Sequence, residues 1–445
     1  MPTPGSDLRP AGLGSKRKAL FVVIVKLRFF KCLILLAIIL PVTSVSAQDT
    51  TQKIIPGRTN SVASVAKPYV LLVSIDGFRY DYARRFGATN LLRYSEKGVR
   101  GKGSRPAFPS LTFPNHYTIA TGLYPAHHGL VDNYFYDKNK GEGYAANSPR
   151  TVRDSSWYNG KPLWVLAEQS KMLAACFYWV GSEAAIQGVR PTYNYHYNTS
   201  ITAPERVGIV KNWLRLPDSL RPHLVCMYFS EVDYAGHVYG ADAPQVGKAV
   251  QYIDSIIGLL VNAVAETGID VNFMVVSDHG MTTVDNENPM RLPASIDTSR
   301  FVIPRGDAMI QLYAKDANDI RPLYRQLRKT AYGYTPYRRN SLPRRWKYGG
   351  KHDRFDRVGD IILLAKPPKV FNINYSAVDR GKHGFDPRLK EMLAGFYAWG
   401  PAFKTGITVR EFDNIHIYPL VAHILGLSNN HQIDGKLKVL KRILK

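Results

Sequence analysis

Two short apolar runs, "YVLLVSIDG" (69–77) and "VNFMVVSDHG" (271–280), decide the fold of this chain. Each run is nearly continuous in apolar residues and ends in an aspartate beside glycine or histidine. Runs that are apolar at every position fit strands buried on both faces, as in the centre of a helix-covered sheet. Similar runs lie at 173–180, 223–233 and 358–365, and we expect them in the same sheet.

Helical patterns lie between these runs, most clearly at 243–268 and 414–427. Alternating strands and helices predict an α/β fold, with helices on both faces of the sheet and ligands at the carboxyl ends of the strands. Residues 281–356 have weaker patterning, and we expect them to form a small insertion or cap.

The amino end has the layout of a secretory signal peptide. A basic region precedes the apolar run "CLILLAIILPV" and the small residues "TSVSA", which predicts export with cleavage after Ala47. An uncleaved signal anchor is the alternative, and only then is a membrane a partner. The polar residues 48–67 are expected to be a linker, 68–430 one catalytic domain and 431–445 a basic tail.

The composition indicates a large globular protein with an affinity for anions. Lys and Arg number 59 against 35 Asp and Glu, giving a net charge of +24, which favours phosphate esters, nucleic acid or a lipid surface. Beyond the leader only Cys176 and Cys226 remain, both in apolar runs. We expect buried free thiols rather than a bridge, and no small disulfide scaffold.

Acidic and histidine residues gather at the predicted strand ends and at one later loop. Carboxylates and imidazoles suit zinc, and two such sets can hold two metals. Each residue alone has an ordinary explanation, because an aspartate after a strand often caps a helix and a histidine often packs in a core. The residues of this cluster are Asp76, Asp233, His237, Asp278, His279 and His383.

Thr112 stands between two prolines in "FPSLTFPNHYTIATG" (108–122), directly before a predicted helix. Pro114 suits a first helical turn, and the amino end of a helix attracts phosphate. Two cations about 3.5–4 Å apart can clamp both oxygens of a displacement at phosphorus and activate the Thr112 hydroxyl. A simple helix cap is the alternative role for this residue.

The segments "LLVSIDGFRYDY", "FPSLTFPNHYTIATGLYPAHHGLVDN", "FSEVDYAGHVYG", "VVSDHGM" and "KHGFDP" occur in this order over 69–387. Together they resemble the nucleotide pyrophosphatase/phosphodiesterase family of the alkaline phosphatase superfamily. The resemblance implies an alkaline-phosphatase-like fold with a central, largely parallel mixed sheet. Because this chain lacks the cysteine-rich modules and nuclease-like domain of large animal members, a compact bacterial-type enzyme, periplasmic or secreted, is expected.

The resemblance also implies a site with two zinc ions. Asp233, His237 and His383 would hold one ion, and Asp76, Thr112, Asp278 and His279 the other. Thr112 would form a covalent threonyl intermediate while the Asp233 zinc stabilises the leaving oxygen, and a hydroxide on that zinc would release the nucleoside monophosphate. The sequence leaves the identity of the metal open.

Substrate contacts are implied in the same way. Asn133 matches a residue that contacts a phosphate oxygen, although a turn would also explain it. Phe113 and Tyr197 match two aromatics that sandwich a nucleobase, and Glu183, near Val180 where proline is usual, would contact sugar or base. From spacing alone, Phe113 and Tyr197 are ordinary aromatics.

Two other functions remain open. A relative with the same metals could act on phosphomonoesters or choline-phosphate lipids, although the neighbours of Thr112 lack the Arg or Lys that monoesterases place there. The basic, aromatic run 321–357 could instead mark a surface protein that binds polyanions. We expect a nucleotide or nucleotide ester as the partner and no specific binding of nucleic acid.

Overall fold

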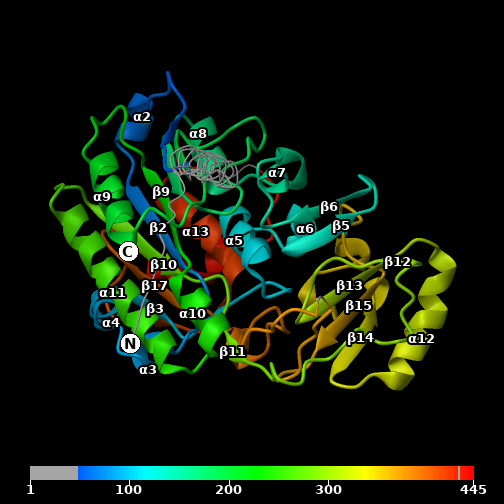
Figure 1. The fold of residues 1–445 in the computed structure, drawn as a ribbon. Helices are drawn as coiled ribbons and strands as arrows, with labels where there is room; N and C mark the ends of the chain where they lie inside the picture. Colours follow the sequence, from blue (N-terminus) through cyan, green and yellow to red (C-terminus); the bar gives the residue numbers. More distant parts are fainter. Residues whose placement is uncertain (1–48, 374, 429–430) are drawn as a thin grey trace, which may run out of the picture. The chain divides into compact units, whose positions relative to one another are not determined.

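The computed structural model of this chain describes residues 49–373, 375–428 and 431–445. The predicted signal peptide or anchor, 1–47, lies outside the described residues. A nine-stranded sheet forms the centre of the fold (Figure 1), in the order β1-β8-β7-β9-β2-β10-β17-β3-β18. Its strands are β1 (Lys53–Ile54), β8 (Tyr193–Tyr195), β7 (Ala174–Phe177), β9 (Leu224–Phe229), β2 (Tyr69–Ile75), β10 (Val271–Val276), β17 (Phe396–Trp399), β3 (Val99–Gly101) and β18 (Ile407–Val409).

Five neighbouring strands of this sheet, β8 to β10 in the spatial order, run parallel. β1 and β17 pair with their neighbours in the antiparallel direction, so the sheet is mixed but largely parallel. The predicted α/β architecture is therefore confirmed. The three central strands β9, β2 and β10 are the segments that end in the aspartate-bearing turns.

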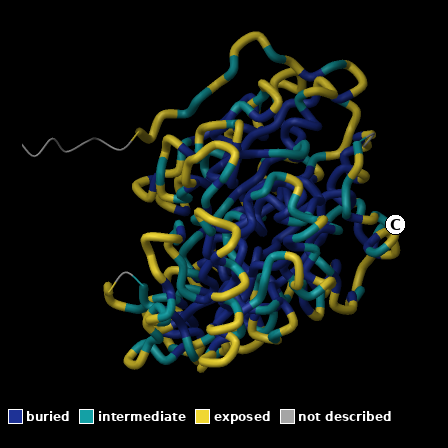
Figure 2. Tube along the Cα trace, turned by 90° about the vertical axis from the view of Figure 1, so that its right-hand side faces the viewer, coloured by how far each residue is buried: buried dark blue, intermediate teal, exposed yellow. Residues whose placement is uncertain are grey.

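Alternate residues of β2 enter two separate cores. Val70 and Leu72 pack with one core, whereas Leu71 and Val73 pack with the other, because successive side chains of a strand point to opposite faces. Figure 2 shows the buried interior between the exposed coverings. The first core is covered by α5 (Thr112–Thr121), α6 (Pro125–His128), α8 (Leu163–Gln169) and α13 (Ile417–Ile424), and the second by α3 (Tyr82–Arg85), α4 (Thr89–Glu96), α9 (Ala203–Leu214), α10 (Glu231–Tyr239) and α11 (Pro244–Ala265).

A smaller lobe follows β10 in the chain and has its own core. It holds the antiparallel sheet β12-β13-β15-β14 and α12 (Ile320–Thr330), seen in yellow in Figure 1. The expectation that 358–365 is a strand of the central sheet is wrong. That run forms β15, and it is fully apolar because it lies in the middle of the small sheet and is buried there. The strands are β12 (Phe301–Val302), β13 (Met309–Ala314), β14 (Tyr334–Arg338) and β15 (Ile361–Ala365).

Short strand pairs and helices complete the described chain. The pairs are β11 (Thr282–Thr283) with β16 (Gly381–Lys382), β4 (Ser104–Arg105) with β19 (Phe412–Asp413), and β5 (Tyr134–Asp137) with β6 (Glu142–Ala145); the helices are α2 (Val62–Val65) and α7 (Pro149–Val152). Within the expected linker, β1 extends the edge of the central sheet, and α2 follows it.

The basic residues 431–445 pack onto the domain. Leu440 and Ile443 are buried in the first core, and the N–H groups of Asp434 and Gly435 both donate to the carbonyl of Gly122 at 2.9 Å. Gly122 ends α5, so this closing segment, 431–445, holds the last turn of that helix. The segment expected as a tail is thus part of the folded core.

Two further features bear on the predictions. Cys176 and Cys226 are buried free thiols on the adjacent strands β7 and β9, as expected. Among the described residues, α11 is the one helix long and apolar enough to cross a membrane. Its buried residues, including Ile253 and Ile257, belong to the second core, which is ordinary for a core helix.

Candidate active site

The site forms where three adjacent parallel strands end. Asp76 directly follows β2, Asp278 and His279 follow β10, and Asp233 lies in the first turn of α10 behind β9. Because the carboxyl ends of parallel strands meet at one edge of a sheet, these residues converge although the chain separates them widely. His383, in the loop after β16, completes the group from the other side.

Thr112 is the first residue of α5, and its side chain faces this group. Its Oγ1 lies 3.2 Å from His279 Nε2. The extended residue before it, Leu111, occupies the helix-cap position and makes no side-chain cap. The alternative that Thr112 is a simple helix cap is therefore wrong, and its hydroxyl is available to the site.

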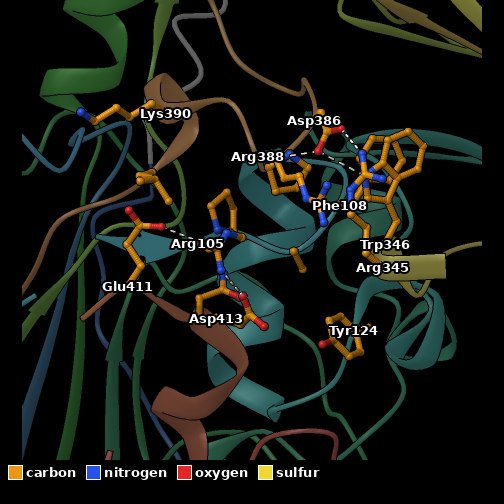
Figure 3. A pocket seen from close by; sticks show the side chains of 15 residues that line it. Arg105, Phe108, Tyr124, Arg345, Trp346, Asp386, Arg388, Lys390, Glu411 and Asp413 are labelled. Carbon is orange, nitrogen blue, oxygen red and sulfur yellow. Dashed lines mark hydrogen bonds and ion pairs between the residues drawn. The ribbon is translucent and has the colours of Figure 1, made fainter. Parts of the chain in front are cut away.

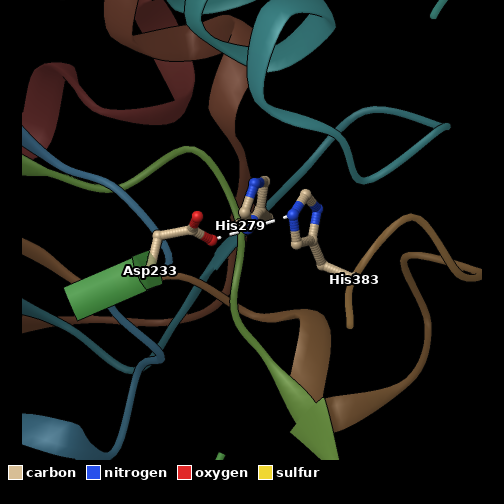
Figure 4. Close-up of side chains that lie close together, drawn as sticks. All are labelled: Asp233, His279 and His383. Carbon is tan, nitrogen blue, oxygen red and sulfur yellow. Dashed lines mark ion pairs between the residues drawn. The ribbon is translucent and has the colours of Figure 1, made fainter. Parts of the chain in front are cut away.

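Two groups of ligand atoms are compact enough to hold a cation, judged over the described part of the chain. The atoms of Asp233, His279 and His383 lie within 4.8 Å of one another, as do those of Asp76, Asp278 and His279. Figure 4 shows the first group converging. His237 Nε2 joins it, 3.2 Å from His383 Nε2 and 3.4 Å from Asp233 Oδ2.

The donor set fits divalent cations. Asp76 Oδ1 and Asp233 Oδ1 are buried and accept no hydrogen bond from any described residue. Buried carboxylate oxygens without partners are costly unless a cation compensates them. Backbone carbonyls fix the far ring nitrogens of two histidines, since His237 Nδ1 and His383 Nδ1 lie 2.9 Å from the oxygens of Gly381 and Ser110. Such contacts orient imidazoles for metal binding.

The charges of the site shift its ionisation. Burial, followed by the charges of Asp278 and Asp233, raises the pKa of Asp76 well above its usual value. Burial also raises the pKa of Asp278, but the rings of His279 and His116 outweigh it and hold that pKa well below the usual range. Burial and the rings of His279 and His237 lower the pKa of His383, which keeps this imidazole neutral and able to bind a metal.

Two supporting residues escaped the sequence reasoning. Tyr228 donates its hydroxyl to Asp76 Oδ2 at 2.6 Å. His116 lies one turn after Thr112 on α5, with Nδ1 3.2 Å from Asp278 Oδ2 and 3.0 Å from the Thr112 carbonyl. The spacing of four residues, which places side chains on one helix face, was the available signal for His116.

A pocket of about 440 Å³ opens beside Thr112. Phe113 and Tyr197 both line it, as do Val180 and Glu183, so the structure brings the expected substrate residues together. We call it the aromatic pocket. Its full lining is Thr112, Phe113, Ala146, Asn147, Pro149, Val152, Arg153, Tyr178, Trp179, Val180, Gly181, Glu183, Tyr197 and Tyr228.

Glu183 holds this pocket together from within. Its Oε1 accepts the backbone N–H of Tyr197, and its Oε2 accepts Arg153 Nε, each at 2.9 Å. Arg153 is a lining residue that sequence reasoning did not find. No motif marks it, because its place in the pocket depends on the fold around α7.

Asn133 contacts the residue after Thr112 and is not part of the aromatic-pocket lining. Its Oδ1 accepts the backbone N–H of Phe113 at 3.0 Å, which fixes the side chain and leaves the amide N–H groups to donate. A cavity of about 130 Å³ lined by Asn133, His237 and His383 also contains Arg305 and Lys382. Lys382 is neutralised by Asp307 and Asp379 at 2.8 and 2.6 Å.

Comparison with known proteins decides the family. The type I phosphodiesterase / nucleotide pyrophosphatase family matches residues 70–386. The chain belongs to this family. It is therefore a hydrolase of the alkaline phosphatase superfamily, as the motifs predicted, and its family is one of metal-dependent phosphodiesterases.

Individual members of this phosphodiesterase family resemble the chain over most of its length. An uncharacterised pyrophosphatase/phosphodiesterase of Schizosaccharomyces pombe is 34% identical to this chain, and the match covers 94% of this chain and 86% of the yeast protein. Ectonucleotide pyrophosphatase/phosphodiesterase family member 1 of Rattus norvegicus is 32% identical over 84% of this chain. The match spans only 43% of that rat protein.

Solved structures of family members agree with the fold. Murine ectonucleotide pyrophosphatase/phosphodiesterase 5 superposes with a TM-score of 0.79 at 28% identity, covering 85% of this chain and 100% of the murine one. An inactive threonine-to-alanine variant of the murine protein, in complex with AMP, gives a TM-score of 0.80.

Proposed function

We propose that this protein is an exported phosphodiesterase that cleaves nucleotide esters or nucleotide pyrophosphates and releases nucleoside monophosphates. One observation carries the proposal. Thr112 contacts the carboxylate and imidazole cluster through His279 and also lines the aromatic pocket. A phosphoryl group at Thr112 would thus have cation ligands on one side and space for a base on the other.

Thr112 is the proposed nucleophile. Its Oγ, after losing its proton, forms a bond to phosphorus while the bond from phosphorus to the leaving oxygen breaks. Water then hydrolyses the threonyl ester, which returns the hydroxyl and frees the monophosphate. The Asn133 amide would donate to a phosphate oxygen, and its hydrogen bond with the Phe113 N–H supports this role.

Two zinc ions are proposed to complete the site. Asp233, His237 and His383 would hold one, and Asp76, Thr112, Asp278 and His279 the other, with His279 close to both groups. When bound, such cations acidify the nucleophile and neutralise charge on the transferred phosphoryl group. The partnerless oxygens of Asp76 and Asp233 support this assignment.

The aromatic pocket supports nucleotides as substrates. Phe113 and Tyr197 offer ring faces on which any base can stack. The murine relative in complex with AMP, together with the ectonucleotide and venom phosphodiesterase names of other relatives, supports nucleotide substrates and export. Arg305 has no ion-pair partner among the described residues and lines the small cavity that also contains His237 and His383, where we expect it to meet an anionic leaving group.

Activity on three esters tests the substrate class. We expect kcat/KM for thymidine monophosphate p-nitrophenyl ester to exceed that for p-nitrophenyl phosphate and p-nitrophenyl phosphocholine by at least about a hundred-fold. EDTA should abolish turnover, and zinc should restore it. A preference for the monoester or the choline ester would overturn the nucleotide assignment while leaving the metals and Thr112 in place.

Replacing the nucleophile tests the covalent step. Thr112→Ala should lower kcat by more than about a thousand-fold, whereas Thr112→Ser, which keeps a hydroxyl, should retain part of the activity. Metal content measured by mass spectrometry should remain near two zinc ions in the serine variant. Normal turnover by Thr112→Ala would contradict the threonyl intermediate.

A further inference from the structure

A second hollow of about 420 Å³ lies beside β3 and has no lining residue in common with the aromatic pocket. Four cationic side chains line it, Arg84 from α3, Arg100 and Lys102 from β3 and its end, and Lys390 from the loop before β17. We call it the cation cavity. No substrate or catalytic residue proposed above belongs to it.

The register of the central sheet explains why these cations gather. Arg100 lies opposite Tyr397 of β17 and opposite Thr408 of β18, so the three share one face of the sheet. Lys102, two residues after Arg100, points to that same face. Near the centre of the sheet this face is apolar and covered by helices, but at its β18 edge it carries two cations and remains open to the cavity.

None of the four cations of the cavity forms an ion pair within the part of the chain that the structure describes. Arg84, Arg100 and Lys102 form no ion pair with any described residue, and Lys390 lies over the Tyr80 ring, 5.6 Å from its centroid. Four positive charges held together repel one another, and an anion relieves that repulsion.

The two carboxylates of the cavity are already engaged elsewhere. Asp81 pairs with Arg79 at 2.7 Å, and Glu411 pairs with Arg105 at 2.7 Å. Figure 3 shows Glu411 turned toward Arg105 in the neighbouring hollow, which also contains Lys390. The cavity is therefore lined by four cations and two carboxylates, and each carboxylate is shared with an arginine outside it, which leaves an excess of positive charge.

We propose that the cation cavity is a second ligand site, which binds a compact anion with two or more phosphate or sulfate groups. Several separate cations around a few hundred Å³ match several anionic groups on one small molecule. Arg84 and Arg100 can each donate two hydrogen bonds to one anionic group, and Lys102 and Lys390 add positive charge. A single monoanion would leave most of the four cations unpaired.

Calorimetric titration of the zinc-loaded protein with myo-inositol hexasulfate tests the proposal, because sulfates resist phosphodiesterases and bind zinc weakly. We expect one equivalent to bind, with an affinity that falls steeply as salt is raised. Arg100→Gln and Lys102→Gln should each weaken binding about ten-fold, the value of one charge-assisted hydrogen bond. Arg100→Lys should restore most of the affinity.

Two control variants distinguish the cation cavity from the rest of the charged surface and from the catalytic centre. Arg325→Gln on α12 removes one exposed cation elsewhere that forms no ion pair with any described residue, and it should change the affinity by less than about two-fold. Asp233→Asn alters the catalytic centre and should leave the affinity unchanged. An equal loss of affinity in Arg325→Gln would show that the anion binds by general charge attraction. A loss of affinity in Asp233→Asn would show that it binds at the catalytic centre. Either result overturns the proposal.

Competition identifies the natural class of anion. Inorganic tripolyphosphate and the α,β-methylene analogue of adenosine triphosphate, added at equal free zinc, should displace the hexasulfate. Displacement by either compound supports a site for phosphate chains. Stronger competition by the adenosine triphosphate analogue than by tripolyphosphate would show that the nucleoside contributes to binding. Failure of both would overturn phosphate as the ligand. Activity of Arg100→Gln on the nucleotide ester should stay unchanged throughout.

Discussion

Glu183 lies in the aromatic pocket, yet both of its carboxylate oxygens are bound to the protein itself. One accepts the N–H of Tyr197, and the other accepts Arg153. The side chain is largely buried, so these two bonds form in a setting of low polarity, where charge-assisted hydrogen bonds are strong. We therefore propose that Glu183 acts as a positioning residue, whereas the direct sugar or base contact stays a prediction.

A neutral amide at this position tests that role. Glu183→Gln should raise KM for thymidine monophosphate p-nitrophenyl ester about five- to thirty-fold, because the amide keeps one acceptor oxygen, so either the Tyr197 backbone N–H or Arg153 loses a bond of about 1–2 kcal/mol. The kcat for bis-p-nitrophenyl phosphate, which has no base, should change little. Equal losses for both substrates would contradict a role limited to the pocket.

The sequence located the candidate metal-binding residues because their positions follow from strand ends. Asp76 and Asp278 directly follow β2 and β10, and these two strands are parallel neighbours, so the two aspartates lie at the same edge of the sheet. Tyr228 and Arg153 could not be found in this way. Tyr228 is one aromatic residue among many in strand β9, and only the packing shows that its hydroxyl reaches Asp76.

Among the elements, the turn between β2 and α3 approaches α10 closely. Gly77 has φ +64°, and a Cβ there would lie 2.9 Å from both Cα and Oδ1 of Asp233. The turn thus needs glycine for its backbone conformation and for the space beside the Asp233 carboxylate, a candidate metal ligand.

Alanine at this turn should displace Asp233. Gly77→Ala should lower the zinc affinity and kcat by at least about ten-fold, and destabilise the protein by more than about 2 kcal/mol. Gly57→Ala is the matched control, because Gly57 has φ +75° but open space where a Cβ would stand. It should cost only about 1 kcal/mol of backbone strain. Similar zinc affinities in the two variants would exclude crowding as the cause.

Sequence reasoning misplaced one strand because the periodicity of a segment shows which of its faces are buried, but not which sheet it joins. The apolar run that forms β15 has the same character as β2 or β10, since a central strand of any covered sheet is buried on both faces. Which sheet it joins depends on pairing with β13 and β14, and long-range pairing leaves no mark in local patterning. The edge strand β1 is too short for any periodicity.

At the scale of the whole molecule, Asp132 links the main domain to the small lobe. Its Oδ2 accepts Gln311 Nε2 of β13 at 3.0 Å. Burial raises the pKa of Asp132 from 3.8 to about 7, although the bond from Gln311 opposes the rise. The folded state thus binds more protons than the unfolded state between these two pH values, and the Asp132 contribution to stability falls as pH rises through this window.

The pH dependence of unfolding checks this contact. Asp132→Asn mimics the protonated carboxyl, so its free energy of unfolding relative to wild type should increase from pH 4 to pH 7 and then level off. The slope should be at most about 1.4 kcal/mol per pH unit. Urea denaturation of both proteins at several pH values measures the difference, and a constant difference would show that Asp132 does not titrate there.

The closing segment, 431–445, has a consequence for biosynthesis. The helix that begins with Thr112 is closed at Gly122 by the N–H groups of Asp434 and Gly435, and the Asp434 carboxylate also accepts the N–H of Tyr124. The ribosome synthesises this helix more than 300 residues before it reaches Asp434 and Gly435, which bind the end of the helix. The nascent chain therefore carries Thr112, the proposed nucleophile, on a helix that lacks this contact until residues 434 and 435 have emerged.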